Sequence, residues 1–288
     1  MYTLLITSGR RPQLFRRTIN SFKTYCLDHH LISEWICIDD GTDETTRKEL
    51  ALEYPKIKFI NKTPDQVGHA LSLNIATPLL TTKYTIRLED DWEFIGPEPA
   101  PLITQAVKIL DEFPMAGQVM FNANYQETAN VKLLGGRLAH TADGMEFMWH
   151  DYASGDDAMK LWHQRHGYGQ SVLQCWPHFS LQPSVTRTEV FKTLGYFNES
   201  SSYFEYQYGQ SYMKKGWQTA FLNQVSCIHI GRIINDRNGP LNAYELLGQE
   251  QFGHAPRAVP STVTETDYTQ VRSLIVNNRS ITSDCSDF

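Results

Sequence analysis

The sequence contains few cysteines, and they are too widely spaced to form a metal-binding or disulfide framework. Its 288 residues include five cysteines, and no two of them form a Cys-x-x-Cys pair. This spacing excludes a zinc ribbon and a dense network of disulfide bonds, so we expect reduced thiols. The five positions are Cys26, Cys37, Cys175, Cys227 and Cys285.

The sequence also lacks a long hydrophobic run and an excess of positive charge. No apolar stretch is long enough to span a bilayer, and Arg10 and Arg11 follow the first apolar run, which reverses the order of a signal peptide. We therefore expect a cytoplasmic protein with no signal peptide and no transmembrane segment. The formal net charge of -6 and the pI near 5.9 give no overall attraction to nucleic acid. A local basic patch is compatible with that charge, so nucleic acid stays a secondary hypothesis.

What the sequence does contain is a regular alternation of short apolar runs with helical periods. A hydrophobic content of 41% and an aromatic content of 12% suffice for a substantial core. Alternating strands and helices imply right-handed crossovers, which predicts an α/β fold with a mostly parallel sheet flanked by helices. We expect strands at residues 2–7, 34–39, 57–60 and 84–88, and helices at residues 12–26, 44–54 and 68–76.

Two acidic clusters follow strands in this pattern: Asp39 and Asp40 after the second strand, and Glu89, Asp90 and Asp91 after the fourth. Parallel sheets bind ligands beyond the carboxyl ends of their strands, so both clusters are expected at the binding edge. Three adjacent carboxylates repel one another unless a positive charge compensates them, and hard oxygen ligands of this kind suit Mg²⁺ or Mn²⁺. A solvated acidic turn is the alternative interpretation.

The residues around these clusters resemble the motifs of GT-A glycosyltransferases. Residues 87–92, with Glu89 and Asp91 one residue apart, resemble the Asp-x-Asp metal motif of that fold. Residues 38–43 are similar to its nucleotide motif, an acidic pair followed by Gly and Ser or Thr. Residues 68–74 are similar to the Gly-x-x-x-x-x-Asn helix that precedes the metal strand in family 2 members.

The resemblance implies a GT-A fold, in which a Rossmann-like sheet binds the donor and a second half binds the acceptor. Residues 1–95 would form the nucleotide-sugar-binding half. Residues 96–245 would form the metal-binding and acceptor-binding catalytic half of the same domain, where the chain becomes richer in aromatic residues. Residues 246–288, which end in a polar run rich in Ser and Thr, would form a peripheral C-terminal tail.

The resemblance also implies roles at the nucleotide-sugar donor. Asp40 would accept a hydrogen bond from a pyrimidine N–H, Thr7 would help to hold the base and ribose, and Asp39 would support the turn. These roles make a UDP-linked sugar the favoured donor. The full set expected at the donor is Thr7, Ser8, Arg10, Asp39, Asp40, His69, Asn74, Glu89 and Asp90.

The metal site implied by the resemblance is centred on Asp91. Glu89 would assist directly or through water, and His229, in a short β-type run, resembles a histidine that serves as a further metal ligand in many GT-A enzymes. A lone histidine in a strand is more often structural, which is the alternative for His229. Arg232, which follows this run, is a candidate to neutralise the charge of the diphosphate.

The candidate catalytic base is Glu205. Residues 194–217 resemble the family 2 stretch in which a Gly-x-Phe-Asp/Glu turn leads into an acidic helix, and counting back from Gly216 aligns Glu205 with the catalytic aspartate. Phe204 and Gln207 depart from that pattern. An inverting transfer needs one base to accept the proton of the acceptor hydroxyl. The alternative interpretation of Glu205 is an ordinary surface glutamate in a helix. The other carboxylates that compete for the role of the base are Asp156, Asp157 and Glu199.

The acceptor site is expected to use aromatic side chains, because sugar faces stack on such rings. The candidates are Trp92, Trp176 and His178, although segments rich in rings are more often part of the core.

These observations lead to one functional hypothesis and three alternatives. The hypothesis is a Mn²⁺- or Mg²⁺-dependent, inverting glycosyltransferase that moves a sugar from a nucleotide diphosphate-sugar to a glycan or another hydroxyl acceptor. The alternatives are a nucleotidyltransferase of similar fold, a glycosyltransferase acting on modified bases in DNA, and a sugar-binding module without catalysis. The sequence leaves the oligomeric state open.

Overall fold

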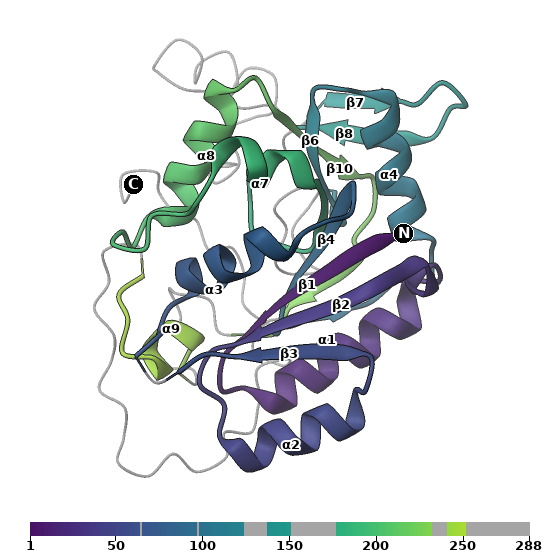
Figure 1. Ribbon diagram of the computed structural model, residues 1–288. Helices are drawn as coiled ribbons and strands as arrows, with labels where there is room; N and C mark the ends of the chain where they lie inside the picture. The colour runs from purple at the N-terminus through teal and green to yellow at the C-terminus, as the bar shows by residue number, and fades with distance from the viewer. Residues whose placement is uncertain (64, 97, 124–136, 151–176, 232–240, 252–288) are drawn as a thin grey trace.

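The computed structural model describes residues 1–63, 65–96, 98–123, 137–150, 177–231 and 241–251, and its centre is a nine-stranded sheet (Figure 1). The strand order is β3-β2-β1-β4-β9-β6-β10-β8-β7. The strands are β1 (Tyr2–Ser8), β2 (Ile32–Asp39), β3 (Ile57–Asn61), β4 (Tyr84–Glu89), β6 (Ala116–Met120), β7 (Arg137–His140), β8 (Glu146–Trp149), β9 (Ser184–Arg187) and β10 (Gln218–Leu222). A separate antiparallel pair consists of β5 (Trp92–Phe94) and β11 (Cys227–His229).

The first four strands are parallel to one another, as the alternation of strands and helices predicts. The helices that connect them are α1 (Pro12–Tyr25), α2 (Glu44–Glu53) and α3 (His69–Ala76), with the short 3₁₀ turns η1 (His29–Leu31) and η2 (Thr77–Leu79). Strands β1, β2 and β4 are buried along most of their length, because helices cover both faces of the sheet. Leu4 and Ile6 pack in a cluster with α1, α2 and α4, whereas Leu5 packs with α3, α7 and α8.

The second half of the chain adds to the same sheet. Its helices are α4 (Leu102–Glu112), α7 (Thr188–Leu194) and α8 (Phe204–Lys214). Strand β9 is antiparallel to both of its neighbours, β4 and β6, and β10 then pairs in parallel with β6. Residues from the two expected halves therefore share one hydrogen-bonded sheet, most of whose strands run in one direction.

The carboxyl ends of β1, β2 and β4 meet at one edge of the sheet. Ser8 pairs with Asp39, and Thr7 pairs with Glu89. The short helix α9 (Ala243–Leu246) also lies at this edge, because Arg10 Nη1 donates to the Leu246 carbonyl at 3.0 Å. The described start of the expected tail thus contacts the loop after β1.

Two further observations concern the class of protein. Among the helices that the structure describes, none combines the length and the apolar composition needed to cross a membrane. Cys26, Cys37 and Cys227 are buried free thiols, while Cys175 and Cys285 lie outside the described residues.

Candidate functional site

Asp90 forms part of the frame of the site. It is 1% exposed, and its Oδ2 accepts hydrogen bonds from Ser8 Oγ at 3.1 Å and from Gly9 N at 3.0 Å, while its Oδ1 pairs with Arg11. Burial raises the pKa of Asp90 to about 6, although Arg11 opposes the shift. Ser8 and Asp90 were both expected at the donor, but here they bind each other and fix the loop after β1 to the end of β4.

Asp91 joins three segments of the chain at the end of β4. Its Oδ2 lies 2.8 Å from Arg11 Nη1 and 3.1 Å from His229 Nε2, and its carbonyl accepts from Ile230 N. The pairing of β11 with β5 brings His229 to this position, opposite Trp92. Burial acts to raise the pKa of Asp91, but Arg11 and His229 outweigh it and hold the pKa well below its usual range. Asp91 is therefore an ionised carboxylate with a histidine beside it.

Asp91 and His229 fit a divalent cation as a pair of ligands. Two donor atoms on adjacent corners of an octahedron with bonds of about 2.1 Å lie about 3 Å apart, and the two side-chain atoms here lie 3.1 Å apart. The described residues contain no group of three or more His, Cys, Asp or Glu placed to hold a metal. Mg²⁺ and Mn²⁺ commonly use one or two protein ligands and complete their shell with water and substrate phosphates. The donor set present suits that kind of site.

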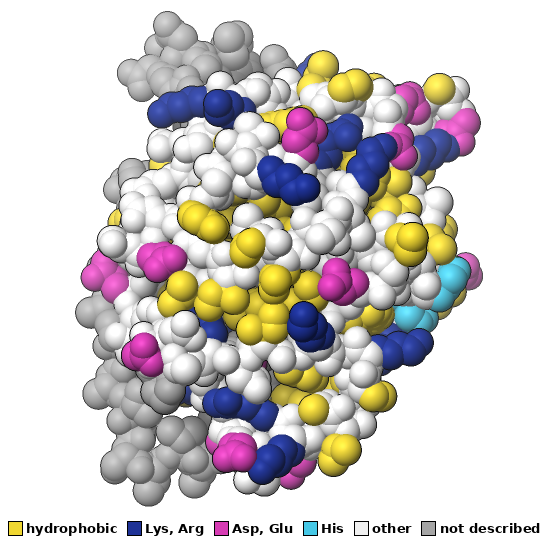
Figure 2. All heavy atoms as spheres, in the orientation of Figure 1, with side chains coloured by type: hydrophobic (Ala, Val, Ile, Leu, Met, Phe, Trp, Pro, Cys, Tyr) yellow, Lys and Arg dark blue, Asp and Glu magenta, His cyan; other side chains and the backbone are white. Residues whose placement is uncertain are grey.

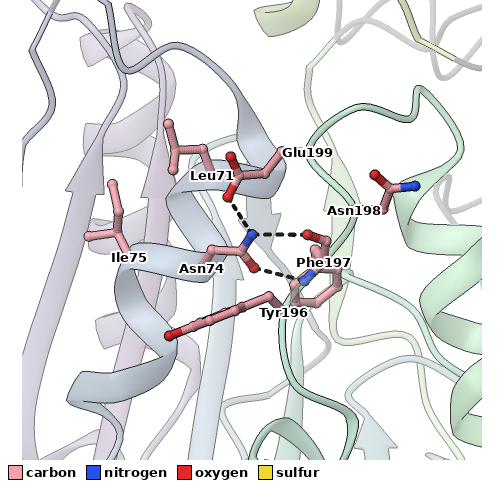
Figure 3. A pocket seen from close by; sticks show the side chains of 7 residues that line it. All are labelled: Leu71, Asn74, Ile75, Tyr196, Phe197, Asn198 and Glu199. Carbon is pink, nitrogen blue, oxygen red and sulfur yellow. Dashed lines mark hydrogen bonds between the residues drawn. The ribbon is translucent and has the colours of Figure 1, made fainter.

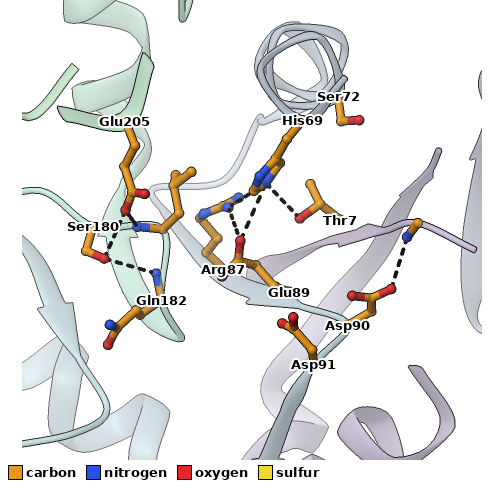
Figure 4. Close-up of polar contacts among 12 residues, drawn as sticks. Thr7, His69, Ser72, Arg87, Glu89, Asp90, Asp91, Ser180, Gln182 and Glu205 are labelled. Carbon is orange, nitrogen blue, oxygen red and sulfur yellow. Dashed lines mark hydrogen bonds and ion pairs between the residues drawn. The ribbon is translucent and has the colours of Figure 1, made fainter. Parts of the chain in front are cut away.

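Glu89 points into a second cluster, on the α3 side of β4 (Figure 4). Its Oε2 accepts from Trp92 Nε1 at 3.3 Å, and its Oε1 lies 3.6 Å from His69 Nε2 and 4.0 Å from Arg87 Nη2. Burial and the neighbouring charge of Asp91 raise the pKa of Glu89 to about 8. Glu89 thus connects the donor-side residues to the end of β4, and it forms no three-ligand group with Asp91 and His229.

His69 links the end of β1 to the start of α3 and to α9. Its Nε2 lies 3.2 Å from Thr7 Oγ1 and 3.3 Å from Arg87 Nη2, and its Nδ1 lies 3.0 Å from Tyr244 Oη. An arginine only donates, so Nε2 is the acceptor and Nδ1 carries the hydrogen that Tyr244 accepts. Burial, with the charge of Arg87, holds the pKa of His69 well below its usual value. Sequence reasoning assigned no role to Arg87 or Tyr244.

Asp40 is fixed in place by a buried lysine. Its Oδ2 accepts from Gly68 N at 2.9 Å and lies 2.8 Å from Nζ of Lys62, which is 3% exposed. Lys62 Nζ also donates to Ser72 Oγ and to the Gly68 carbonyl. Burial lowers the pKa of Lys62, and Asp40 opposes that shift. The contacts with Gly68 and Lys62 both use the same carboxylate oxygen of Asp40, Oδ2.

Asp39 holds the turn that follows β2, the role that the family resemblance implies. Its carboxylate accepts from Thr42 N at 3.2 Å and from Thr42 Oγ1 at 2.6 Å, and Arg47 Nε lies 3.4 Å away. Arg10 braces the same turn, because its Nε donates to the Gly41 carbonyl at 3.1 Å. Arg10 thus connects the turn after β2 to α9, and its expected contact with the donor stays a prediction.

Asn74, which is expected at the donor, connects α3 to the loop before α8 by hydrogen bonds. Its Nδ2 donates to the Phe197 carbonyl at 2.9 Å and to Glu199 Oε1 at 2.6 Å, and its Oδ1 accepts from Phe197 N at 2.8 Å (Figure 3). These three bonds leave its amide occupied and fasten the loop before α8 to α3. A pocket of about 390 Å³ lies beside these hydrogen bonds, on the face where Figure 2 shows hydrophobic side chains gathered. It is lined by Leu71, Asn74, Ile75, Tyr196, Phe197, Asn198 and Glu199.

Glu205 lies in the first turn of α8 and faces the cluster around Arg87 and Glu89 (Figure 4). Its Oε1 accepts from Leu181 N at 2.7 Å and from Ser180 Oγ at 3.1 Å. These bonds orient the carboxylate from the side away from the donor edge. The structure thus places Glu205 on the same edge as Glu89, 116 positions earlier in the sequence, as the hypothesis of a catalytic base requires.

The two expected acceptor residues that the structure describes, Trp92 and His178, both pack against histidine rings. Trp92 is 1% exposed and packs in the core, with its ring centroid 5.1 Å from that of His229, so it offers no free face to a sugar. His178 packs on His150 with ring centroids 4.4 Å apart and accepts from Thr219 N at 3.4 Å. The other residues raised from the sequence, Trp176, Asp156, Asp157 and Arg232, lie outside the described residues.

Comparison by sequence finds no match, since neither a protein-family model nor a curated protein matches this chain. Comparison by structure finds similar folds. A mannosyltransferase, PcManGT from Pyrobaculum calidifontis in complex with GDP-Man and Mn²⁺, is 15% identical with a TM-score of 0.52, over 82% of this chain. S. aureus TarS 1–349 in complex with UDP-GlcNAc is 12% identical with a TM-score of 0.54, over 96% of this chain. GalNAc-T7 with UDP, GalNAc and Mn²⁺ is 12% identical with a TM-score of 0.51, over 80% of this chain.

These likenesses show that the chain has the GT-A fold, which confirms the expected fold class. The chain spans 58% of the mannosyltransferase, 71% of the TarS fragment and 44% of GalNAc-T7. At these identities the likeness concerns the fold alone.

Proposed function

We propose that this protein is a metal-dependent glycosyltransferase that moves a sugar from a nucleotide diphosphate-sugar to a hydroxyl acceptor, such as that of a glycan. The observation that carries the proposal is the pair formed by Asp91 and His229, whose donor atoms lie 3.1 Å apart at the carboxyl end of β4. Two further groups support it: Thr7 and His69 on the donor side, and Glu205 on the other side of Glu89.

The nucleotide is proposed to bind at the ends of β1 and β2. Lys62 Nζ pairs with the Asp40 carboxylate, which also accepts a hydrogen bond from Gly68 N. A carboxylate accepts from the N–H of uracil but cannot donate to the ring nitrogen that adenine presents as an acceptor. This complementarity disfavours an adenine nucleotide, but the carboxylate accepts the N–H groups of uracil and of guanine alike. Between these two we propose a UDP-linked donor, since UDP-GlcNAc and UDP are named for two of the similar structures and GDP-Man for one.

The diphosphate is proposed to lie at Asp91 and His229. These two residues would hold Mn²⁺ or Mg²⁺, and the bound ion would stabilise the negative charge that develops on the departing diphosphate. Arg11 orients Asp91, because the guanidinium pairs with both Asp90 and Asp91 from the α1 side. Mn²⁺ is named for the complexes of PcManGT and GalNAc-T7.

Glu205 is proposed to be the base of an inverting transfer. The acceptor hydroxyl attacks the anomeric carbon, a bond forms between the two, and the bond to the diphosphate breaks on the opposite face. The hydroxyl proton passes to the Glu205 carboxylate, whose Oε1 is oriented by Leu181 N and Ser180 Oγ. The hydrogen bonds from the loop before β9 keep this carboxylate facing the donor edge.

Calorimetric titration with UDP in the presence and absence of Mn²⁺ tests the proposal. Wild-type protein should bind UDP more tightly when Mn²⁺ is present, and Asp91→Ala should lose that gain while keeping its melting transition. Asp111→Ala is a suitable control, because Asp111 is a half-exposed carboxylate on α4 that bonds Tyr84 and Lys83, away from this edge. If the affinity of Asp91→Ala for UDP still rises with Mn²⁺, the assignment of the metal site is wrong.

A further inference from the structure

Arg87 is a fully buried arginine whose only recorded ion pair among the described residues, with Glu89, lies at the outer limit of ion-pair distance. It lies in β4 and is 0% exposed. Its Nη2 approaches His69 Nε2 at 3.3 Å and Glu89 Oε1 at 4.0 Å. Its Nε and Nη1 are buried and have no hydrogen-bond partner in the part of the chain that the structure describes. A buried guanidinium in this state is costly, so the site calls for an anionic ligand.

The position of Arg87 relates it to the donor. Arg87 and Glu89 point to the α3 face of β4, because the intervening Leu88 points into the cluster on the α1 side. Figure 4 shows the guanidinium between His69 on one side and Glu205 on the other. A sugar attached to a diphosphate at Asp91 must extend toward Glu205 for its anomeric carbon to be attacked there. Arg87 lies between His69 and Glu205, beside that path (Figure 4).

We propose that Arg87 binds a carboxylate on the transferred sugar, so that the donor is a nucleotide diphosphate linked to an acidic sugar of the uronic acid class. The inference rests on the proposed function and adds a substrate class to it. A carboxylate matches the two unpartnered nitrogens, Nε and Nη1, as a bidentate acceptor. A sugar hydroxyl would satisfy one hydrogen bond but leave the positive charge without compensation.

The diphosphate is the other anion that the donor carries, and the structure favours the sugar over it. The pair of Asp91 and His229 already supplies metal ligands for the diphosphate. Arg87 lies on the opposite side of Glu89 from that pair. The two occupants differ in a measurable way, because UDP alone carries the diphosphate without the sugar.

The test uses donors that differ only at C6. Calorimetric titrations with Mn²⁺ compare UDP-glucuronic acid with UDP-glucose, GDP-mannuronic acid with GDP-mannose, and UDP and GDP alone. Wild-type protein should bind the acidic member of the preferred pair about 10- to 100-fold more tightly, the range expected for a charge-assisted pair. Equal binding of both members, or tighter binding of the neutral member, overturns the inference while the proposed function stands. If no nucleotide or nucleotide-sugar binds, the proposed function fails and the inference fails with it.

Substitutions of Arg87 test whether this residue is the source of the preference for the acidic sugar. Arg87→Met should reduce the preference for the acidic sugar to about 1-fold and leave the affinity for UDP alone nearly unchanged. An equal loss of affinity for UDP would assign Arg87 to the diphosphate and overturn the inference. Arg87→Lys, which keeps the charge but not the planar fork, should retain part of the preference and decides the matter if the methionine variant does not fold. Arg187→Met is the control, because Arg187 lies in the neighbouring strand β9 and donates to the Ala116 carbonyl.

Discussion

Gly231 is the position where a single methyl group should disturb the site most. A Cβ at residue 231 would lie 2.9 Å from both Cβ and Cγ of Asp91 and closer still to its Oδ2. The side chain of Asp91 cannot easily move away, because Arg11 and His229 hold its carboxylate and Ile230 N donates to its backbone carbonyl. Gly231→Ala therefore forces either strain in the backbone after β11 or displacement of the Asp91 side chain.

The two responses have different magnitudes, and both can be measured. Overpacking of this kind typically costs about 1–3 kcal/mol in the free energy of unfolding. If the carboxylate moves instead, its contacts with Arg11 and His229 are lost, and disruption of a buried ion pair costs about 3–5 kcal/mol. We expect urea unfolding to show a loss of at least about 1 kcal/mol. The gain in UDP affinity that Mn²⁺ provides should fall by about 10-fold or more, because a displaced Asp91 no longer lies beside His229.

Gly9→Ala is the matched control for this experiment. Gly9 also borders the carboxylates, since its N–H donates to Asp90, but a Cβ there would meet its nearest neighbours at 3.9 Å, an ordinary contact distance. Its unfolding free energy should stay within about 0.5 kcal/mol of wild type. The reasoning is refuted if Gly231→Ala matches Gly9→Ala in both unfolding free energy and response to Mn²⁺.

Three further predictions concern single carboxylates. Glu205→Gln should reduce turnover by roughly 10²- to 10⁴-fold with nearly unchanged donor affinity, measured by transfer assay and titration; normal turnover would move the base elsewhere. Asp40→Asn should weaken UDP binding by about 1–3 kcal/mol, and competition among UDP, GDP and ADP should rank UDP first in wild type. Glu89 has a pKa of about 8 in the folded protein against a usual 4.5, so the native state binds more protons between these values. The unfolding free energy of the metal-free protein should therefore fall as pH rises through that window, by at most about 1.4 kcal/mol per pH unit, and Glu89→Gln should flatten the slope in urea melts at several pH values.

The donor half could be predicted from the sequence because its signals are local. Apolar runs such as that around Leu4 and Ile6 mark the strands, and polar turns mark where they end. Parallel strands share one carboxyl edge, so the sequence predicts that the clusters at Asp39 and Glu89 lie close together. The neighbourhood of Asp91 and His229, 138 residues apart, was reached only through the family resemblance. Their proposed role as metal ligands remains a prediction.

The partners of the site residues could not be predicted, because they depend on side-chain direction. Arg10 and Arg11 are adjacent and identical, yet Arg10 takes a positive φ of 57°, and Arg11 turns inward to the acidic pair. Asn74 matched the family motif in type, but its partner is the backbone of Phe197, which belongs to a distant loop.

Trp92 shows the same limit for an aromatic residue. A tryptophan after a metal motif suggests an exposed platform, but the pairing of β5 with β11 turns its ring into the core. The antiparallel position of β9 was also missed, because Ser184–Arg187 is too short and too polar to show a clear period.

Strand β9 has a mechanical consequence for the whole molecule. Its four residues form ladders with β4 on one side and β6 on the other, and Gln118 Nε2 reinforces the seam by donating to the Ser180 carbonyl at 2.7 Å. Because β9 belongs to the second half of the chain, moving the two halves apart would break its ladder with β4. We therefore expect the sheet to behave as one rigid unit. In the proposed reaction, this sheet would fix the distance between the donor edge and Glu205 in the folded protein.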